Sequence, residues 1–124
     1  MGHPVSMNLS TLTLIAGLAL AAAGPVLGAG NAAAGAHAWT AEHPAAEDPS
    51  PRSCSTCHTA DLTKPGKLAS TGKPIEPMAV SVNPTRLTDP AKVEKWFRRN
   101  CHWTLGRACT EEEKADFLAY IKSL

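Results

Sequence analysis

The feature that most constrains this chain is the pentapeptide Cys54-Ser55-Thr56-Cys57-His58. Two thiols with two residues between them can reach both vinyl groups on one edge of a porphyrin, and the next residue can carry an imidazole to the central metal ion. This spacing is the attachment sequence of a c-type haem. We therefore expect one covalent haem c, bound through Cys54 and Cys57, with His58 as an axial ligand of the iron.

Two other kinds of site also contain a Cys-x-x-Cys pair. A structural zinc site needs a second close pair, whereas the two remaining cysteines, Cys101 and Cys109, are eight positions apart. A thioredoxin-like dithiol needs a strand before the motif, and residues 49–53 include prolines at 49 and 51. Haem attachment is therefore the favoured interpretation.

The start of the sequence has the layout of a secretory signal peptide. Residues 9–27 are largely apolar, residues 28–38 are mostly small, and no Asp, Glu, Lys or Arg occurs before Glu42. A retained membrane anchor is the alternative, but the strongly apolar stretch is short for a membrane span. We expect residues 1–38 to be removed and the mature chain to be periplasmic, where disulfides persist. The candidate cleavage positions follow Ala34, Ala36 and Ala38.

The chain has room for one small domain. Its 124 residues include 12 basic and 11 acidic side chains, a formal charge of +1 that does not point to nucleic acid. We expect an irregular arm over residues 39–53 and a single domain over residues 54–124. Residues 62–88 are rich in proline and glycine, so neither a long helix nor a paired strand is expected there. Such a loop suits a small domain that wraps a cofactor and takes its core from it.

Two helices are predicted in the C-terminal part. Asp89 is a suitable N-cap, Pro90 suits the first helical position, and Gly106 breaks the segment. Thr110 and Glu113 form a capping box for the second helix. The apolar faces consist of Val93, Trp96 and Phe97, followed by polar Asn100, in the first helix, and of Phe117, Leu118, Ile121 and Leu124 in the second.

Cys101 and Cys109 remain after the haem motif is assigned. In an oxidising compartment their short separation favours a disulfide. In the chain-entropy model, closing this loop stabilises the folded protein by about 2–3 kcal/mol. Two free buried thiols are the alternative.

The ligand on the other side of the iron decides between electron transfer and gas binding. Met78 lies in Pro77-Met78-Ala79, which superficially resembles the Met ligand loop of small cytochromes c, although a Met is often only packing. Asn100 is a polar amide on an apolar face, and either a haem iron or an ordinary hydrogen bond at the helix end would satisfy it. Two further candidates are His102, beside the proposed disulfide, and His43, expected to face solvent in the arm.

Most of the predicted domain, about residues 53–124, resembles the SHP-type monohaem cytochromes c (the sphaeroides haem protein family). The most specific part is the Arg-Asn-Cys triplet with a second Cys eight residues later. The matching residues are Cys54–His58, residues 71–79 with Asn83-Pro84, residues 88–96, Arg99-Asn100-Cys101, and Gly106-Arg107 with Cys109-Thr110.

The resemblance implies a class I cytochrome c-like fold with Asn100 as the sixth iron ligand and a disulfide between Cys101 and Cys109. It also implies that this ligand is released on reduction and that the ferrous haem then binds oxygen or nitric oxide. A dihaem cytochrome c is the implied electron-donating partner. Family members usually carry an N-terminal helix that packs on the last helix. The short, proline-broken stretch over residues 39–53 predicts that this helix is lost or reduced here.

The prediction is therefore an all-α, single-domain, periplasmic monohaem cytochrome c. It transfers electrons and, when reduced, binds small diatomic ligands (O2, NO, CO). Its iron has His58 as proximal and Asn100 as labile distal ligand. An ordinary low-spin His/Met electron carrier that uses Met78 is the alternative.

Trp96 and Phe97 are expected to line the haem pocket, and Trp103 either lines it as well or belongs to the ordinary core. Electron transfer and ligand binding are expected rather than enzymatic catalysis, although a minor redox activity on a diatomic ligand stays open. Contact with a membrane is expected only through a partner. A basic surface on the first of the two predicted helices consists of Lys92, Lys95, Arg98 and Arg99. This surface either suits an acidic redox partner or is merely a solvated helix face.

Overall fold

The computed structural model describes residues 1–2, 30–44, 48 and 50–124 of the chain, so residues 3–29 of the predicted leader lie outside the described residues. The described part is mainly helical, as predicted. None of its helices is long and apolar enough to cross a membrane. The elements are α1 (Ala32–Thr40), α2 (Ser55–His58), β1 (Gly66–Lys67), β2 (Pro74–Ile75), α3 (Pro90–Leu105) and α4 (Glu111–Lys122).

The two C-terminal helices begin and end as their cap residues predict. The Asp89 side chain accepts a hydrogen bond from the Lys92 backbone N–H at 3.1 Å, and Pro90 opens α3. Gly106 ends α3 in the left-handed conformation, with φ +70°. Thr110 and Glu113 form the predicted capping box of α4, through hydrogen bonds of 3.1 and 2.8 Å.

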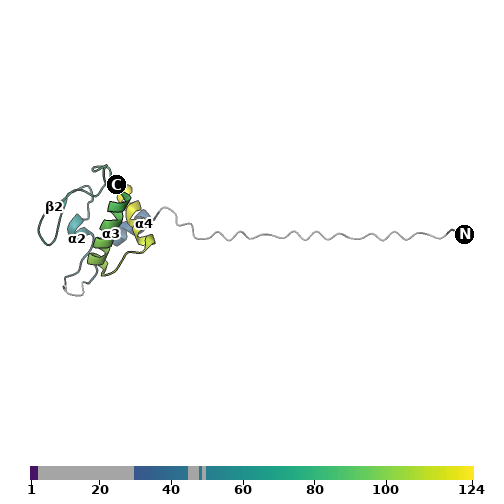
Figure 1. The fold of residues 1–124 in the computed structure, drawn as a ribbon, viewed down its shortest axis with the longest axis horizontal. Coiled ribbons are helices and arrows are strands. Elements are labelled where there is room, and N and C mark those ends of the chain that lie inside the picture. Colours follow the sequence, from purple (N-terminus) through teal and green to yellow (C-terminus); the bar gives the residue numbers. More distant parts are fainter. Residues whose placement is uncertain (3–29, 45–47, 49) are drawn as a thin grey trace.

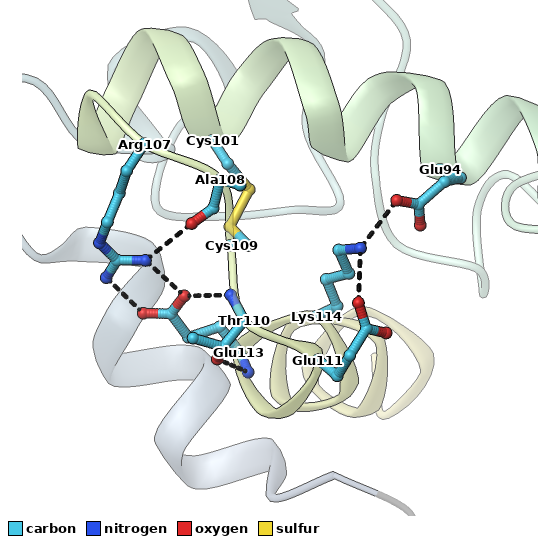
Figure 2. Close-up of polar contacts among 9 residues, drawn as sticks. All are labelled: Glu94, Cys101, Arg107, Ala108, Cys109, Thr110, Glu111, Glu113 and Lys114. Atoms are coloured by element: carbon cyan, nitrogen blue, oxygen red, sulfur yellow. Dashed lines mark hydrogen bonds and ion pairs between the residues drawn. A yellow bond between two sulfur atoms is a disulfide. The ribbon is translucent and has the colours of Figure 1, made fainter.

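Polar contacts reinforce the junction of α3 and α4 (Figure 2). The Arg107 guanidinium donates to both carboxylate oxygens of Glu113, at 2.9 and 2.7 Å. The Lys114 ammonium pairs with Glu94 of α3 at 2.7 Å and with Glu111 of α4 at 2.9 Å. These contacts lie beside the disulfide between Cys101 and Cys109, so ionic and covalent links fix the same turn.

The N-terminal helix that was expected to be lost or reduced is present as α1, nine residues long, so the prediction of its loss is wrong. The side chain of Asn31 caps α1 by accepting the Ala34 N–H at 3.1 Å, and α1 packs on α4. Gly35 is buried at this contact, where a Cβ atom would overlap the backbone of Asp116. Trp39, placed in an irregular arm by the sequence analysis, instead lies near the C-terminal end of α1 in the core.

Helix α1 also spans the predicted cleavage positions. Cleavage after Ala34 would remove the first three residues of a helix that packs on the domain, and cleavage after Ala36 or Ala38 would remove most of it. Alanine-rich sequence serves both as a signal-peptide end and as a good helix former, so the residues alone do not separate the leader from α1.

The loop between α2 and α3 contains a short paired segment, which corrects the prediction that no paired strand fits there. β1 and β2 pair antiparallel, with Gly66 opposite Ile75 and Lys67 opposite Pro74. Proline is tolerated because both strands of this pair are edges. Gly66 lies directly against the haem motif, where a Cβ atom would overlap the carbonyl oxygen of Cys57.

The buried core joins the helices to this loop. Phe117 and Ile121 are buried as predicted, but Leu124 is 38% exposed and is not part of the buried stripe. In Figure 1, α2 and β2 lie on one side of α3, and α4 lies on the other. The buried apolar residues are Trp39, Leu62, Ala79, Cys101, Cys109, Phe117 and Ile121.

Candidate functional site

A cavity of about 1280 Å³ is bounded by the haem motif, the long loop, α3 and α4. Ordinary small-molecule pockets measure about 300–1,000 Å³, so this volume is large for a domain of this size. Cys54, Cys57 and His58 all line it. The folded chain therefore places the three residues of the predicted attachment motif at the edge of one large space.

The two motif cysteines do not have the properties of a redox-active dithiol. Both are free and half-buried, and burial raises the pKa of the Cys54 thiol to about 11. Reactive dithiols have a lowered pKa. No group of three or more His, Cys, Asp or Glu side chains that could hold a metal ion occurs in the described part of the chain. The raised pKa of the Cys54 thiol therefore disfavours the redox-active dithiol.

His58 has the chemistry of a metal ligand. Burial lowers its pKa to about 4, and the guanidinium of Arg86 acts in the same direction. The imidazole is thus neutral near pH 7, which is the form that binds metals. Among the described residues, its Nδ1 atom is the buried side-chain polar atom that has no hydrogen-bond partner.

Three of the four candidates for the distal ligand line the cavity. Asn100, His102 and Met78 contribute to its walls, whereas His43 does not. His43 lies in the arm, where its backbone pairs with that of Arg52. The structure therefore separates His43 from the site and brings the other three candidates to it.

The predicted aromatic residues also line the cavity. Phe97 packs against the core, while Trp96 and Trp103 remain 43% and 38% exposed. Large aromatic side chains exposed around a hollow indicate a surface that something apolar covers. A porphyrin fits this lining, because the cavity walls carry these aromatic side chains together with the two thiols and the imidazole of the haem motif.

Two residues of the site were not singled out by the sequence. Trp39 lines the cavity from α1, and its ring centroid lies 5.5 Å from that of His58. Arg86 lines it from the loop, and its guanidinium donates to the carbonyl oxygens of Pro77 and Glu76 at 2.9 and 2.5 Å. Trp39 was not singled out because it was assigned to an irregular arm, whereas it lies in α1. Arg86 carries no sequence signal, because its partners are backbone carbonyls.

Comparison with known proteins agrees with this site. A family model described as a domain of unknown function (DUF1924) matches residues 26–121. The cytochrome c-type protein SHP of Cereibacter sphaeroides is 53% identical over 73 residues, which are 59% of this chain and 56% of that protein. Cytochrome c'' of Methylophilus methylotrophus is 46% identical over 68 residues, 55% of this chain and 47% of that protein. The match thus spans about half the length of these relatives.

Solved structures extend the likeness to the fold. The structure of oxidised SHP, described as an oxygen-binding cytochrome c, has a TM-score of 0.69 at 42% identity, covering 77% of this chain and 83% of that one. Oxidised cytochrome c'' from Methylophilus methylotrophus has a TM-score of 0.68 at 35% identity, covering 75% of each chain. The class I cytochrome c-like fold is therefore confirmed.

Proposed function

The chain belongs to the SHP-type cytochromes c and carries one covalent haem c, and from this membership we propose that it is a gas-binding cytochrome with a labile distal ligand, Asn100. Haem c supplies a one-electron redox centre and, where an axial position opens, a place for a small gas. Cys54 and Cys57 would hold the haem through thioether bonds, and His58 would be the proximal ligand.

The observation that carries the proposal is the place of Asn100. It lines the same cavity as the haem motif, on α3, and immediately precedes the disulfide-bonded Cys101. An amide oxygen is a hard donor that suits ferric better than ferrous iron. Reduction therefore favours release of Asn100 and opens the site to oxygen, nitric oxide or carbon monoxide. The related SHP is described as oxygen-binding, which supports this ligand class.

Met78 is the ligand in the rival function, an ordinary low-spin electron carrier. Its backbone N–H donates to the carbonyl oxygen of Leu62 at 3.1 Å, and its side chain packs against the core. These contacts favour a packing role for Met78. Successive residues of an α-helix are about 100° apart, so His102, two residues beyond Asn100, lies about 200° further around α3. The two side chains therefore leave the helix in different directions.

Electron delivery is the supporting half of the proposed function. We place the mature protein in the periplasm, where a redox partner such as a dihaem cytochrome c would reduce it. Lys92, Lys95, Arg98 and Arg99 are all exposed on α3 and suit an acidic partner surface. A reduction rate that does not fall as ionic strength rises would remove this steering role.

Ferric absorption spectra of the parent and single variants test the distal ligand. We expect a high-spin or nearly high-spin ferric parent, and rapid binding of carbon monoxide after reduction. Asn100→Ala should alter the ferric spectrum while leaving ferrous carbon monoxide binding within about twofold. Met78→Ala and His102→Ala are the matched controls, because both side chains line the same cavity, and they should leave both spectra unchanged.

The rival function gives the opposite pattern. A low-spin ferric parent with a sulfur–iron band that is lost only in Met78→Ala would identify an electron carrier and end the gas-binding proposal. A low-spin spectrum that is lost only in His102→Ala would assign the distal position to that imidazole instead.

A further inference from the structure

Trp39 connects the N-terminal helix to the imidazole of the haem motif. It is only 5% exposed, and its ring lies against His58 with the centroids 5.5 Å apart and the planes inclined at 44°. We propose that Trp39 is a positioning residue that fixes the orientation of the His58 ring. This inference rests on the proposed function, in which His58 is the proximal ligand of the iron.

The need for such a residue follows from the missing hydrogen bond of His58. A metal-ligating histidine almost always donates its second ring N–H to an acceptor, which holds the ring in one orientation. In the described part of the chain the buried Nδ1 atom of His58 has no such partner. Contact with an aromatic face is a second way to restrict the rotation of an imidazole, and Trp39 supplies that contact.

Trp39 also holds the backbone that follows His58. Its indole N–H donates to the carbonyl oxygen of Thr59 at 3.1 Å. Thr59 has φ +65°, a conformation that a β-branched residue rarely adopts and that persists only where its surroundings hold it. One side chain thus restrains both the ring of His58 and the strained residue after it.

Helix α4 keeps Trp39 itself in place. Its ring makes T-shaped contacts with those of Phe117 and Tyr120, each with centroids 6.1 Å apart and planes at 71° and 66°. The packing of α1 on α4 is therefore linked, through Trp39, to the proposed axial ligand. Asp116 of α4 binds α1 at its other end, where its carboxylate accepts the Asn31 N–H at 2.6 Å, and it does not line the cavity, which makes it a suitable control position.

Resonance Raman spectra of the reduced holoprotein test the proposal, because they report the iron–histidine stretching band directly. Trp39→Leu should shift this band to lower frequency and broaden it. Trp39→Phe keeps an aromatic ring but loses the donor to Thr59, so its shift should be less than half as large. Asp116→Ala should lower the unfolding midpoint but leave the band in place, because it loosens α1 at the end away from Trp39. If Trp39→Leu does not accumulate, Trp39→Phe against Asp116→Ala decides.

The outcomes separate this inference from the proposed function. A reduced parent without an iron–histidine band would contradict the proposed function itself. A parent that has the band, with both Trp39 variants unshifted, would overturn the positioning role and leave the function standing. Equal shifts in Asp116→Ala and the Trp39 variants would also overturn it, because general loosening of the helix pair would then be the cause.

Discussion

The disulfide joins Cys101, the residue after Asn100 on α3, to Cys109, the residue before the N-cap of α4, with Cα atoms 5.5 Å apart. Both cysteines are buried, at 5% and 7% exposure. The helix position that carries the proposed distal ligand is thus tied to the start of the helix that packs against α1. The disulfide that stabilises the junction of α3 and α4 therefore also fixes the backbone next to Asn100.

Removing the disulfide should destabilise the protein. For Cys101→Ala/Cys109→Ala we expect the free energy of unfolding to fall by about 2–3 kcal/mol, because the unfolded chain regains the freedom of the closed loop. Chemical denaturation of the two ferric holoproteins measures this difference. Alkylation of the denatured parent without reductant should modify neither Cys101 nor Cys109, and prior reduction should expose both. Two alkyl groups without reductant would rule out the bond.

Loss of the thioether cysteines should abolish covalent haem. We expect Cys54→Ala/Cys57→Ala to yield little mature protein and no haem band on a denaturing gel, because both attachment points are gone and the small domain lacks its cofactor core. Met78→Ala is the matched control and should keep the band. A strong covalent haem band in the double cysteine variant would refute attachment at these positions.

Glu113 should make stability depend on pH in the acidic range. Its hydrogen bonds to the Arg107 guanidinium lower its pKa to about 2 from an unfolded value near 4.5, against the opposing effect of burial. A lowered folded pKa means that the stabilisation is fully present above about pH 4.5. It is lost as the pH falls through about 2.

The variant Glu113→Gln isolates this effect, because glutamine can still complete the capping box. We expect it to be less stable than the parent by about 0.2–1 kcal/mol at pH 7. The difference should shrink between pH 4.5 and 2. Glu112→Gln is the control, since the Glu112 side chain is exposed and makes no hydrogen bond or ion pair within the described part of the chain. A difference that stays constant from pH 7 to pH 2 would contradict the ionic origin.

Local signals predicted the helices whose determinants lie close together in the sequence. Asp89 with Pro90, and Thr110 with Glu113, specify helix starts through contacts over three residues or fewer. α1 was missed because its stability comes from distant partners: the Asn31 N–H donates to the Asp116 carboxylate at 2.6 Å across 85 positions. No local pattern contains that contact.

The candidate site divides in the same way. Cys54, Cys57 and His58 were predicted because covalent attachment fixes their spacing, and Trp96 and Phe97 because helical periodicity places them on one face. The contributions of other residues depend on tertiary structure alone. Trp39 reaches His58 only after α1 has packed on α4, and Arg86 is oriented by two backbone carbonyls.

The structure of α1 changes the expected mature N-terminus. Asn31 caps the helix and bonds to Asp116, so we expect signal cleavage before Asn31 rather than after Ala34, Ala36 or Ala38. The intact mass of protein exported to the periplasm measures the position directly. A mature chain that begins at residue 35, 37 or 39 would mean that the N-terminal part of α1 is discarded and that cleavage follows Ala34, Ala36 or Ala38.

Gly35 should be intolerant of even the smallest side chain. Alanine is normally better than glycine within a helix by about 0.5–1 kcal/mol, so an isolated helix would gain from Gly35→Ala. Here the added Cβ atom would overlap the backbone of Asp116 and lie 2.9 Å from the Cβ atom of Tyr120. We expect the free energy of unfolding to fall by about 1–3 kcal/mol, the usual effect of overpacking.

Thermal unfolding of the mature holoprotein measures this change. Ala33→Leu, at an exposed position of α1, is the control and should stay within about 0.5 kcal/mol of the parent. A Gly35→Ala protein more stable than the parent would show that α1 does not pack on α4 in solution.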